Sequence, residues 1–170
     1  AAEAAAAPER APVAERAFRD AMAAFPTGVT IVCADDGSAA HGLTVASFSS
    51  LSLEPPQILI CVRAASPFLP IARAAGGFAV HVLARAQKAT AEMFAGGDAA
   101  ARAAMMTRVA GRPPRLEGAL ARFECGLAAD HPGGDHRILI GEVKALERAG
   151  GAEAEALTWW RSRLDALAPR

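Results

Sequence analysis

The most informative stretch of this chain is His41-Gly-Leu-Thr-Val-Ala-Ser-Phe-Ser-Ser-Leu-Ser-Leu-Glu-Pro-Pro56. Small hydroxyl residues stand between apolar ones here, and a double proline ends the run. Small side chains let a ligand approach the backbone, and hydroxyl and free N–H groups bind the polar edges of that ligand. From Gly42 onward the stretch predicts a strand, straight or bent, that runs to Leu53.

The segment that follows adds a cation and the start of a helix. Residues 57–63 form a nearly continuous apolar run, which predicts a buried strand. Ser66 and Pro67 then suit the cap and first position of a helix that extends to about Ala74. Free N–H groups at a helix N-terminus attract anions, and Arg63 would strengthen this attraction. A plain helix cap beside a solvated arginine is the alternative, but the hydroxyl-rich strand favours a cradle for a phosphorylated, partly apolar cofactor.

The remaining pattern places further elements along the chain. Strands are predicted at 29–33, 78–83, 119–129 and 136–146, helices at 12–25, 84–94 and 99–106, and a loop at 111–114. Strands and helices do not alternate regularly, so an antiparallel α+β fold with a closed barrel fits better than a doubly wound parallel sheet. Residues 1–11 are expected to be a flexible leader and residues 12–170 a single domain.

Composition restricts the possible classes of protein. The 170 residues are 52% hydrophobic and 21% charged, which is typical of an ordered globular chain. Eighteen basic residues balance eighteen acidic ones, so we expect no nucleic-acid partner and no anionic membrane surface. No run is long enough to cross a bilayer and the N-terminus lacks the features of a signal peptide, so a cytoplasmic location is expected. Cys33, Cys61 and Cys125 each fall in a predicted strand and are interpreted as buried free thiols.

Polar residues near the end of the chain allow two interpretations each. The turn Pro132-Gly-Gly-Asp-His136 has an exposed backbone that a second molecule could approach, and His136 could bind a carboxamide or phosphate. A hairpin turn with incidental polar residues explains the same pattern about equally well. Trp159 and Trp160 suit core or dimer packing, or stacking on a planar ligand.

The sequence pattern does not predict a metal site, a Rossmann dinucleotide site or a P-loop. His131, Asp135 and His136 do not suit a shared metal ion, because adjacent residues on an extended chain point to opposite faces. The sequence has neither the glycine pattern of a Rossmann fold nor that of a P-loop. We therefore expect no metal site, and any nicotinamide cofactor would bind in another way.

Several segments, in this order, resemble the flavin reductase family with the FMN-binding split β-barrel (Greek-key) fold, the reductase component of two-component flavin monooxygenases. The matching segments are 18–32, 41–56, 60–66, 78–83, 94–96, 134–136 and 141–143, so the resemblance extends from about Phe18 to Leu146. This chain has Ala46 and His81 where the family frequently has asparagine.

The resemblance implies roles for particular residues. It assigns cofactor binding to Thr27, Gly28, Thr44, Val45, Ala46, Ser47, Cys61, Val62, Arg63, Ser66 and Phe94. Among these, Thr27 and Gly28 would lie near the flavin ring and Ser66 at the phosphate. Gly134, Asp135 and His136 would receive the nicotinamide.

The resemblance also implies an activity, an NAD(P)H:flavin oxidoreductase that transfers hydride from NADH or NADPH to FMN or FAD. No catalytic side chain is expected, because the cofactor supplies the redox chemistry. A homodimer and a partner monooxygenase that receives the reduced flavin are implied as well. The alternatives are a tightly FMN-binding electron-transfer or sensor module, and a barrel with a purely structural or interaction role.

Overall fold

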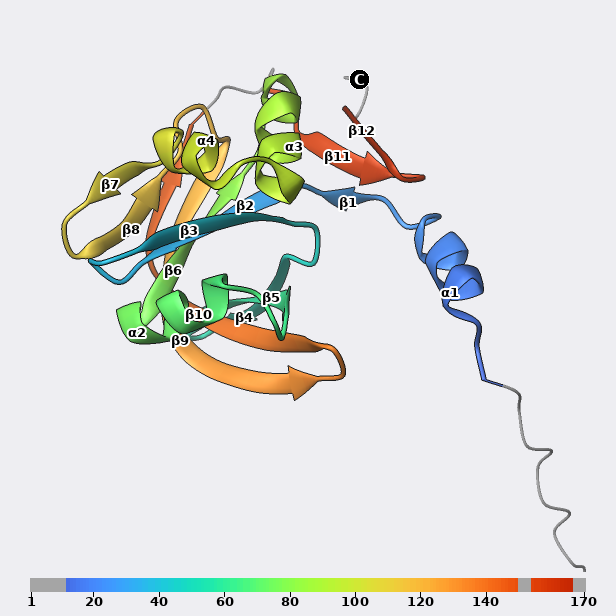
Figure 1. The fold of residues 1–170 in the computed structure, drawn as a ribbon, viewed down its shortest axis with the longest axis horizontal. Coiled ribbons are helices and arrows are strands. Elements are labelled where there is room, and N and C mark those ends of the chain that lie inside the picture. Colours follow the sequence, from blue (N-terminus) through green and yellow to red (C-terminus); the bar gives the residue numbers. More distant parts are fainter. Residues whose placement is uncertain (1–11, 150–153, 167–170) are drawn as a thin grey trace, which may run out of the picture.

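The structure is a computed structural model that describes residues 12–149 and 154–166 (Figure 1). The predicted leader at 1–11 lies outside the described residues. Strands are β1 (Thr27–Gly28), β2 (Thr30–Asp35), β3 (Ala40–Val45), β4 (Ser49–Leu53), β5 (Pro56–Arg63), β6 (Gly77–Val82), β7 (Thr107–Val109), β8 (Arg112–Arg115), β9 (Ala121–Gly133), β10 (His136–Arg148), β11 (Leu157–Trp160) and β12 (Arg163–Ala166). Helices are α1 (Glu15–Met22), α2 (Phe68–Ala75), the 3-10 turn η1 (Arg85–Gln87), α3 (Lys88–Gly96) and α4 (Ala99–Ala104).

Seven strands form one antiparallel sheet in the order β3-β2-β6-β9-β10-β5-β4. Its two edge strands, β3 and β4, are consecutive in the chain and joined only by residues 46–48. Four Cα–Cα steps span at most about 15 Å, so the sheet has to curl until its edges approach each other. Two register shifts between β9 and β10 are consistent with this bending.

The barrel is split rather than closed, because no ladder of hydrogen bonds joins β3 to β4. This corrects the expected closed barrel and the single strand predicted from Gly42 to Leu53. The side chain of Ser47 instead links the residues between β3 and β4 to β5. Its Oγ accepts a hydrogen bond from Cys61 N (2.9 Å) and donates one to Cys61 O (3.0 Å). Residues 46–48 therefore connect one edge of the sheet to the other, and we call them the crossing segment.

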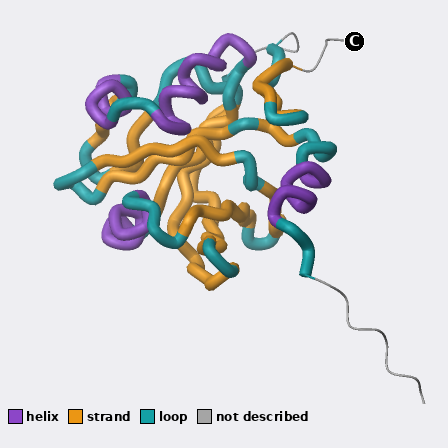
Figure 2. Tube along the Cα trace, turned by 45° about the vertical axis from the view of Figure 1, so that its right-hand side comes forward, coloured by secondary structure: helices purple, strands orange, loops and turns teal. Residues whose placement is uncertain are grey.

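The hydrophobic core has two parts, one on each face of β2. Val32 and Ala34 point into the barrel, where they join side chains of β5, β6 and α2. Ile31 and Cys33 point the other way and pack against α3 and β11. Both faces of β2 are therefore covered, because successive side chains of a strand alternate. The helices lie outside the strands (Figure 2).

Several predicted boundaries differ from the structure. The predicted loop at 111–114 belongs to the β7–β8 hairpin, and the predicted helix at 84–94 divides into η1 and α3. Cys33 and Cys125 are buried as predicted, but Cys61 is only half-buried. The helix predicted at 12–25 is shorter, and none of the residues in α1 is buried. Local apolar spacing predicted this helix, but it could not show that the apolar side of α1 stays uncovered by the other described residues.

The C-terminal residues form a small hairpin that the sequence did not predict. β11 pairs with β1 and β12, so Thr27 lies opposite Trp159. The indole Nε1 of Trp160 donates to Ala24 O (3.3 Å), and Arg161 N donates to Ala23 O (3.0 Å). The hairpin thus holds the end of α1, which stands away from the main sheet (Figure 1).

Candidate functional site

A cavity of about 770 Å³ lies where the crossing segment meets the end of β5, and we call it the crossing cavity. Its lining comprises Leu43, Thr44, Val45, Ala46, Ser47, Cys61, Val62, Arg63, Ala65, Ser66, Pro67, Phe94, Ala95 and His136. Nine of the eleven residues predicted to bind a cofactor are among them, together with His136. The curl of the sheet brings these segments together, because it places the end of β3 beside the end of β5.

One end of the crossing cavity suits an anion. Arg63 is exposed, and its guanidinium has no ion-pair partner among the described residues. Ser66 Oγ accepts a hydrogen bond from Phe68 N (3.3 Å), which leaves the hydroxyl hydrogen free to be donated. This hydroxyl stands at the N-terminus of α2, where the helix dipole favours negative charge. A donor, a cation and a helix N-terminus therefore converge at this end.

The turn between β9 and β10 closes over the same end. Gly134 has φ +67°, a left-handed conformation that glycine adopts without strain. Asp135 O accepts from Ala64 N (2.9 Å), and His136 lies opposite Arg63 in the strand register. A hydrogen bond to the His136 ring (2.6 Å) lowers the pKa of Asp135 below its ordinary value. Only His136 of the three predicted nicotinamide residues lines the cavity.

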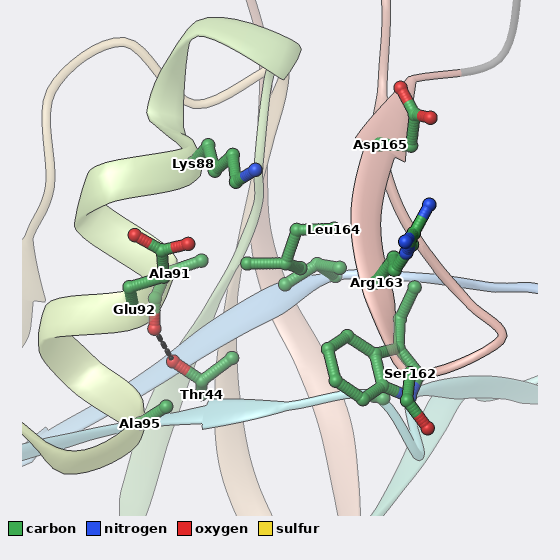
Figure 3. Close-up of a pocket in the computed structure, with 12 residues that line it drawn as sticks. Thr44, Lys88, Ala91, Glu92, Ala95, Ser162, Arg163, Leu164 and Asp165 are labelled. Carbon is green, nitrogen blue, oxygen red and sulfur yellow. Dashed lines mark hydrogen bonds between the residues drawn. The ribbon is translucent and has the colours of Figure 1, made fainter.

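A second cavity of about 800 Å³ adjoins the first, and we call it the hairpin cavity because the β11–β12 hairpin forms one wall (Figure 3). Helix α3 forms the opposite wall. Thr44 and Ala46 line both cavities, as does Ala95. Thr44 Oγ1 donates to Ala91 O (2.6 Å), so this hydroxyl ties β3 to α3 at the shared wall.

Thr27 and Gly28 are the two predicted flavin residues that line neither cavity. They lie in β1, opposite Trp159 and Thr158 of the hairpin. Thr27 Oγ1 is buried without a hydrogen-bond partner in the described chain. A buried hydroxyl without a partner carries a free-energy cost, so it is a group that a bound ligand could satisfy.

Two buried groups away from these cavities have strongly shifted pKa values. Burial and the nearby Arg122 lower the pKa of His81 to about 4, and its Nε2 accepts from Leu116 N (3.2 Å). Burial raises the pKa of Cys125 to about 12. Within the described ranges no three His, Cys, Asp or Glu residues are grouped so that they could hold a metal ion. Neither group therefore points to a second reactive centre.

Sequence reasoning missed most of the hairpin cavity. Lys88, Glu92 and Arg163 line it, but they come from segments whose tertiary positions no local pattern revealed. The only signal was the tryptophan pair, for which stacking on a planar ligand was one interpretation. Ala65 and Ala95, which line the crossing cavity, are small residues without a motif of their own.

The family described as "Flavin reductase like domain" matches residues 22–168, which is nearly the whole chain. The chain belongs to the flavin reductase family. As a flavin reductase it contains, within the described residues, no helix with the length and apolar character needed to span a bilayer.

Named relatives agree with this membership. The flavin reductase is 39% identical over 147 residues to the reductase component of 4-hydroxyphenylacetate 3-monooxygenase of Thermus thermophilus, covering 86% of this chain and 93% of that protein. It is 40% identical over 136 residues to the FMN reductase (NADH) SmoA of Agrobacterium fabrum, covering 79% and 78%. The structure of the NADH:FAD oxidoreductase SgcE6 of Streptomyces globisporus with NAD and FAD fragments matches with a TM-score of 0.82, 34% identity and coverage of 91% and 94%.

These comparisons confirm the family, the split-barrel fold and the reductase activity that the resemblance implied. They favour a reductase over the tightly binding electron-transfer or sensor module. They do not test the individual site residues, which remain predictions supported by their arrangement around the two cavities.

Proposed function

We propose that this flavin reductase transfers hydride from NADH to FMN or FAD held in the crossing cavity, and that a partner monooxygenase receives the reduced flavin. The observation that carries the proposal is the convergence of Arg63, Ser66 and the N-terminus of α2 at one end of that cavity. These groups suit a phosphate, and the apolar lining beyond them suits an aromatic ring.

The residues present fit a flavin. A volume of about 770 Å³ is in the usual range for a cofactor site. Arg63 and Ser66 would hold the phosphate, while Cys61 and Val62 would contribute backbone groups. Thr44, Val45, Ala46 and Ser47 would line the ring and ribityl chain, with Thr27 and Gly28 near the ring. The hydroxyl of Thr27, buried without a partner, supports a polar ligand group on that side.

When bound, the flavin supplies the redox chemistry by accepting a hydride. The chain's own residues would orient the two reactants and exclude water. Phe94 is 1% exposed, so its ring is held firmly at the cavity wall. No side chain is required as a nucleophile or as a general acid.

The turn at Gly134, Asp135 and His136 would orient the nicotinamide. His136 faces the crossing cavity, and its ring is fixed by the 2.6 Å hydrogen bond to Asp135. The relatives named for NADH support this hydride donor, although the sequence left NADPH equally open.

A monooxygenase partner is supported by the Thermus thermophilus relative, which is named as the reductase component of such an enzyme. A homodimer is supported by α1, which leaves Phe18 59%, Met22 52% and, just beyond it, Phe25 64% exposed. Large apolar side chains exposed together on a projecting segment indicate a protein interface. We propose that a second copy of the chain covers them.

NADH oxidation by the purified protein, titrated separately with FMN and FAD, tests the activity. We expect many turnovers per protein and saturation in added flavin. Bound flavin with no more than one equivalent of NADH oxidised would contradict the proposal and favour an electron carrier.

A further inference from the structure

We propose that Asp130 is a positioning residue for the nicotinamide, because its carboxylate ties the end of the β9–β10 hairpin, which carries His136, to helix α2. We call residues 129–140 the β9–β10 tip. This proposal rests on the proposed function, which assigns the turn at 134–136 to the hydride donor. Asp130 lines neither cavity, so it acts through His136 rather than by touching a ligand.

The β9 side of the tip lacks a neighbouring strand in the described part of the chain. Strand β6 pairs with β9 only as far as Gly126, and one further backbone hydrogen bond joins Leu127 N to Gly76 O (2.9 Å). The register between β9 and β10 shifts between Ile140 and Gly141, and such a bulge bends the strands beyond it. Beyond the bulge β9 is therefore an edge strand, whereas β10 stays paired with β5 on its other side.

Asp130 fixes this edge strand through hydrogen bonds from two arginines. Arg73, in the last turn of α2, donates from Nε and Nη2 to Asp130 Oδ2 (2.8 and 2.6 Å). Arg137 Nε donates to Oδ1 (2.6 Å), and Arg137 Nη2 donates to the main-chain oxygen of Asp130 (3.0 Å). The Asp130 side chain is 16% exposed, so these charge-assisted bonds are partly shielded from water and salt. The carboxylate thus joins a helix to the tip.

Helix α2 is the more firmly held of the two partners. Its residues Phe68, Leu69 and Ala72 are buried in the same core cluster as Leu139. Leu139 lies opposite Asp130 in the strand register, and side chains directly opposite each other share a face of the sheet. Asp130 therefore lies on the face that packs against α2. Loss of its carboxylate should let the tip move while α2 keeps its place.

Movement of the tip reaches the crossing cavity through His136. This residue directly precedes Arg137 in β10, and its side chain lines the cavity. The other side of the turn is held independently, because Ala64 N donates to Asp135 O (2.9 Å). Without Asp130 the tip stays attached to β5 but can twist about β10. The orientation of His136 is then held less firmly, so the expected effect is moderate.

The test replaces Asp130 with asparagine, which keeps the size of the side chain and removes its charge. We expect Asp130→Asn to raise the KM for NADH about threefold to tenfold, because a less firmly held turn binds the nicotinamide more weakly. Both kcat and the Kd for FMN should change less than about twofold, since α2 keeps its place. Asp130→Glu retains the carboxylate and should restore most of the affinity for NADH.

A double-mutant cycle separates the Asp130–Arg73 contact from other effects of the Asp130 side chain. Arg73→Gln changes only the helix partner, which is 47% exposed, so the variant remains a usable test if Asp130→Asn does not fold. It should raise the KM for NADH as Asp130→Asn does. The two changes together should raise it no further, because both remove the same contact. Additive effects would overturn the proposal.

The matched control is Asp35→Asn. Arg108 Nε and Nη2 donate to the two carboxylate oxygens of Asp35 (both 2.7 Å), and the Asp35 side chain is 7% exposed. This pair lines neither cavity. Both Asp→Asn variants lose a paired carboxylate, but only Asp130→Asn should change the KM for NADH. An equal rise in both variants, or no rise in Asp130→Asn, contradicts a positioning role.

Hydrogen–deuterium exchange gives a readout that does not depend on turnover. In Asp130→Asn and Arg73→Gln, residues 129–140 should exchange about tenfold faster or more than in the wild type and Asp35→Asn. If the wild type oxidises no NADH with either flavin, the proposed function fails, and exchange alone then decides whether Asp130 holds the tip. Faster exchange supports that role, and unchanged exchange overturns it.

Discussion

Arg63 and Ser66 form the anion-binding end of the crossing cavity, so they should matter only for ligands that carry a phosphate. For Arg63→Ala combined with Ser66→Ala we expect FMN to bind about tenfold to a hundredfold more weakly, since one or two charge-assisted hydrogen bonds are lost. Riboflavin lacks the phosphate, and its Kd should change less than about threefold. Fluorescence titration measures both constants, and similar losses for the two ligands would contradict a phosphate role.

His136 faces the crossing cavity from the strand position opposite Arg63. His136→Ala should raise the KM for NADH by about tenfold, because a hydrogen bond that orients the nicotinamide is lost, while the flavin Kd changes little. Steady-state kinetics and flavin titration give the two values. A loss of FMN affinity without a change in the KM for NADH would instead assign His136 to the phosphate.

His81 should make stability depend on pH. Its pKa is about 4 in the folded chain and near the ordinary 6.5 when unfolded, so between these values only the unfolded chain binds the proton. Its contribution is complete above about pH 6.5 and falls as pH falls to 4, by about 3 kcal/mol in total. His81→Gln is neutral throughout and should remove this part of the slope. Urea unfolding at several pH values measures the free energies.

The control for this prediction is His131→Gln, since His131 is exposed near the end of β9. This variant controls for the replacement of a histidine at the protein surface. Parallel pH profiles for wild type and His81→Gln would show that His81 does not remain neutral in the folded protein.

At the scale of elements, contact between β3 and α3 depends on a glycine. A Cβ at Gly42 would lie 2.5 Å from Phe94 Cε1 and 3.2 Å from Cys33 Sγ. Gly42→Ala should therefore push the Phe94 ring away from β3, lower the free energy of unfolding by about 1–3 kcal/mol and weaken flavin binding. Thermal or urea unfolding and flavin titration are the measurements.

Gly96→Ala is the matched control, because a Cβ there meets nothing within 4 Å. As Gly96 lies in the last turn of α3, alanine should leave stability unchanged or raise it by up to about 1 kcal/mol. If both substitutions had the same effect, the steric account of Gly42 would be wrong.

At the scale of the whole molecule, α1 projects from the sheet with its apolar side chains uncovered (Figure 1). Phe18→Glu with Met22→Glu should convert the proposed dimer into a monomer, because two charges would be buried without partners. Light scattering after size-exclusion chromatography gives the mass. Arg16→Ala, whose side chain is 95% exposed, should leave the mass unchanged. A wild type that is itself monomeric would refute the dimer.

Elements with strong local patterns could be predicted from the sequence. The apolar run at 57–63 became β5, and Ser66-Pro67 marked the start of α2 to within one or two residues. The β7–β8 hairpin was missed because Gly111 and two prolines are typical of loops. The division of the stretch at 42–53 into two edge strands was missed because its composition stays uniform across the crossing.

The sequence by itself determined the family, the antiparallel class and most residues of the crossing cavity, because their residue types are local and ordered along the chain. Only the tertiary structure decided that 46–48 crosses between opposite edges of a split barrel, and that Lys88 and Arg163 share a cavity with Trp159. The physical reason is that sheet curvature and the docking of the C-terminal hairpin arise from contacts between distant segments. The spacing of apolar residues within a single segment does not predict those contacts.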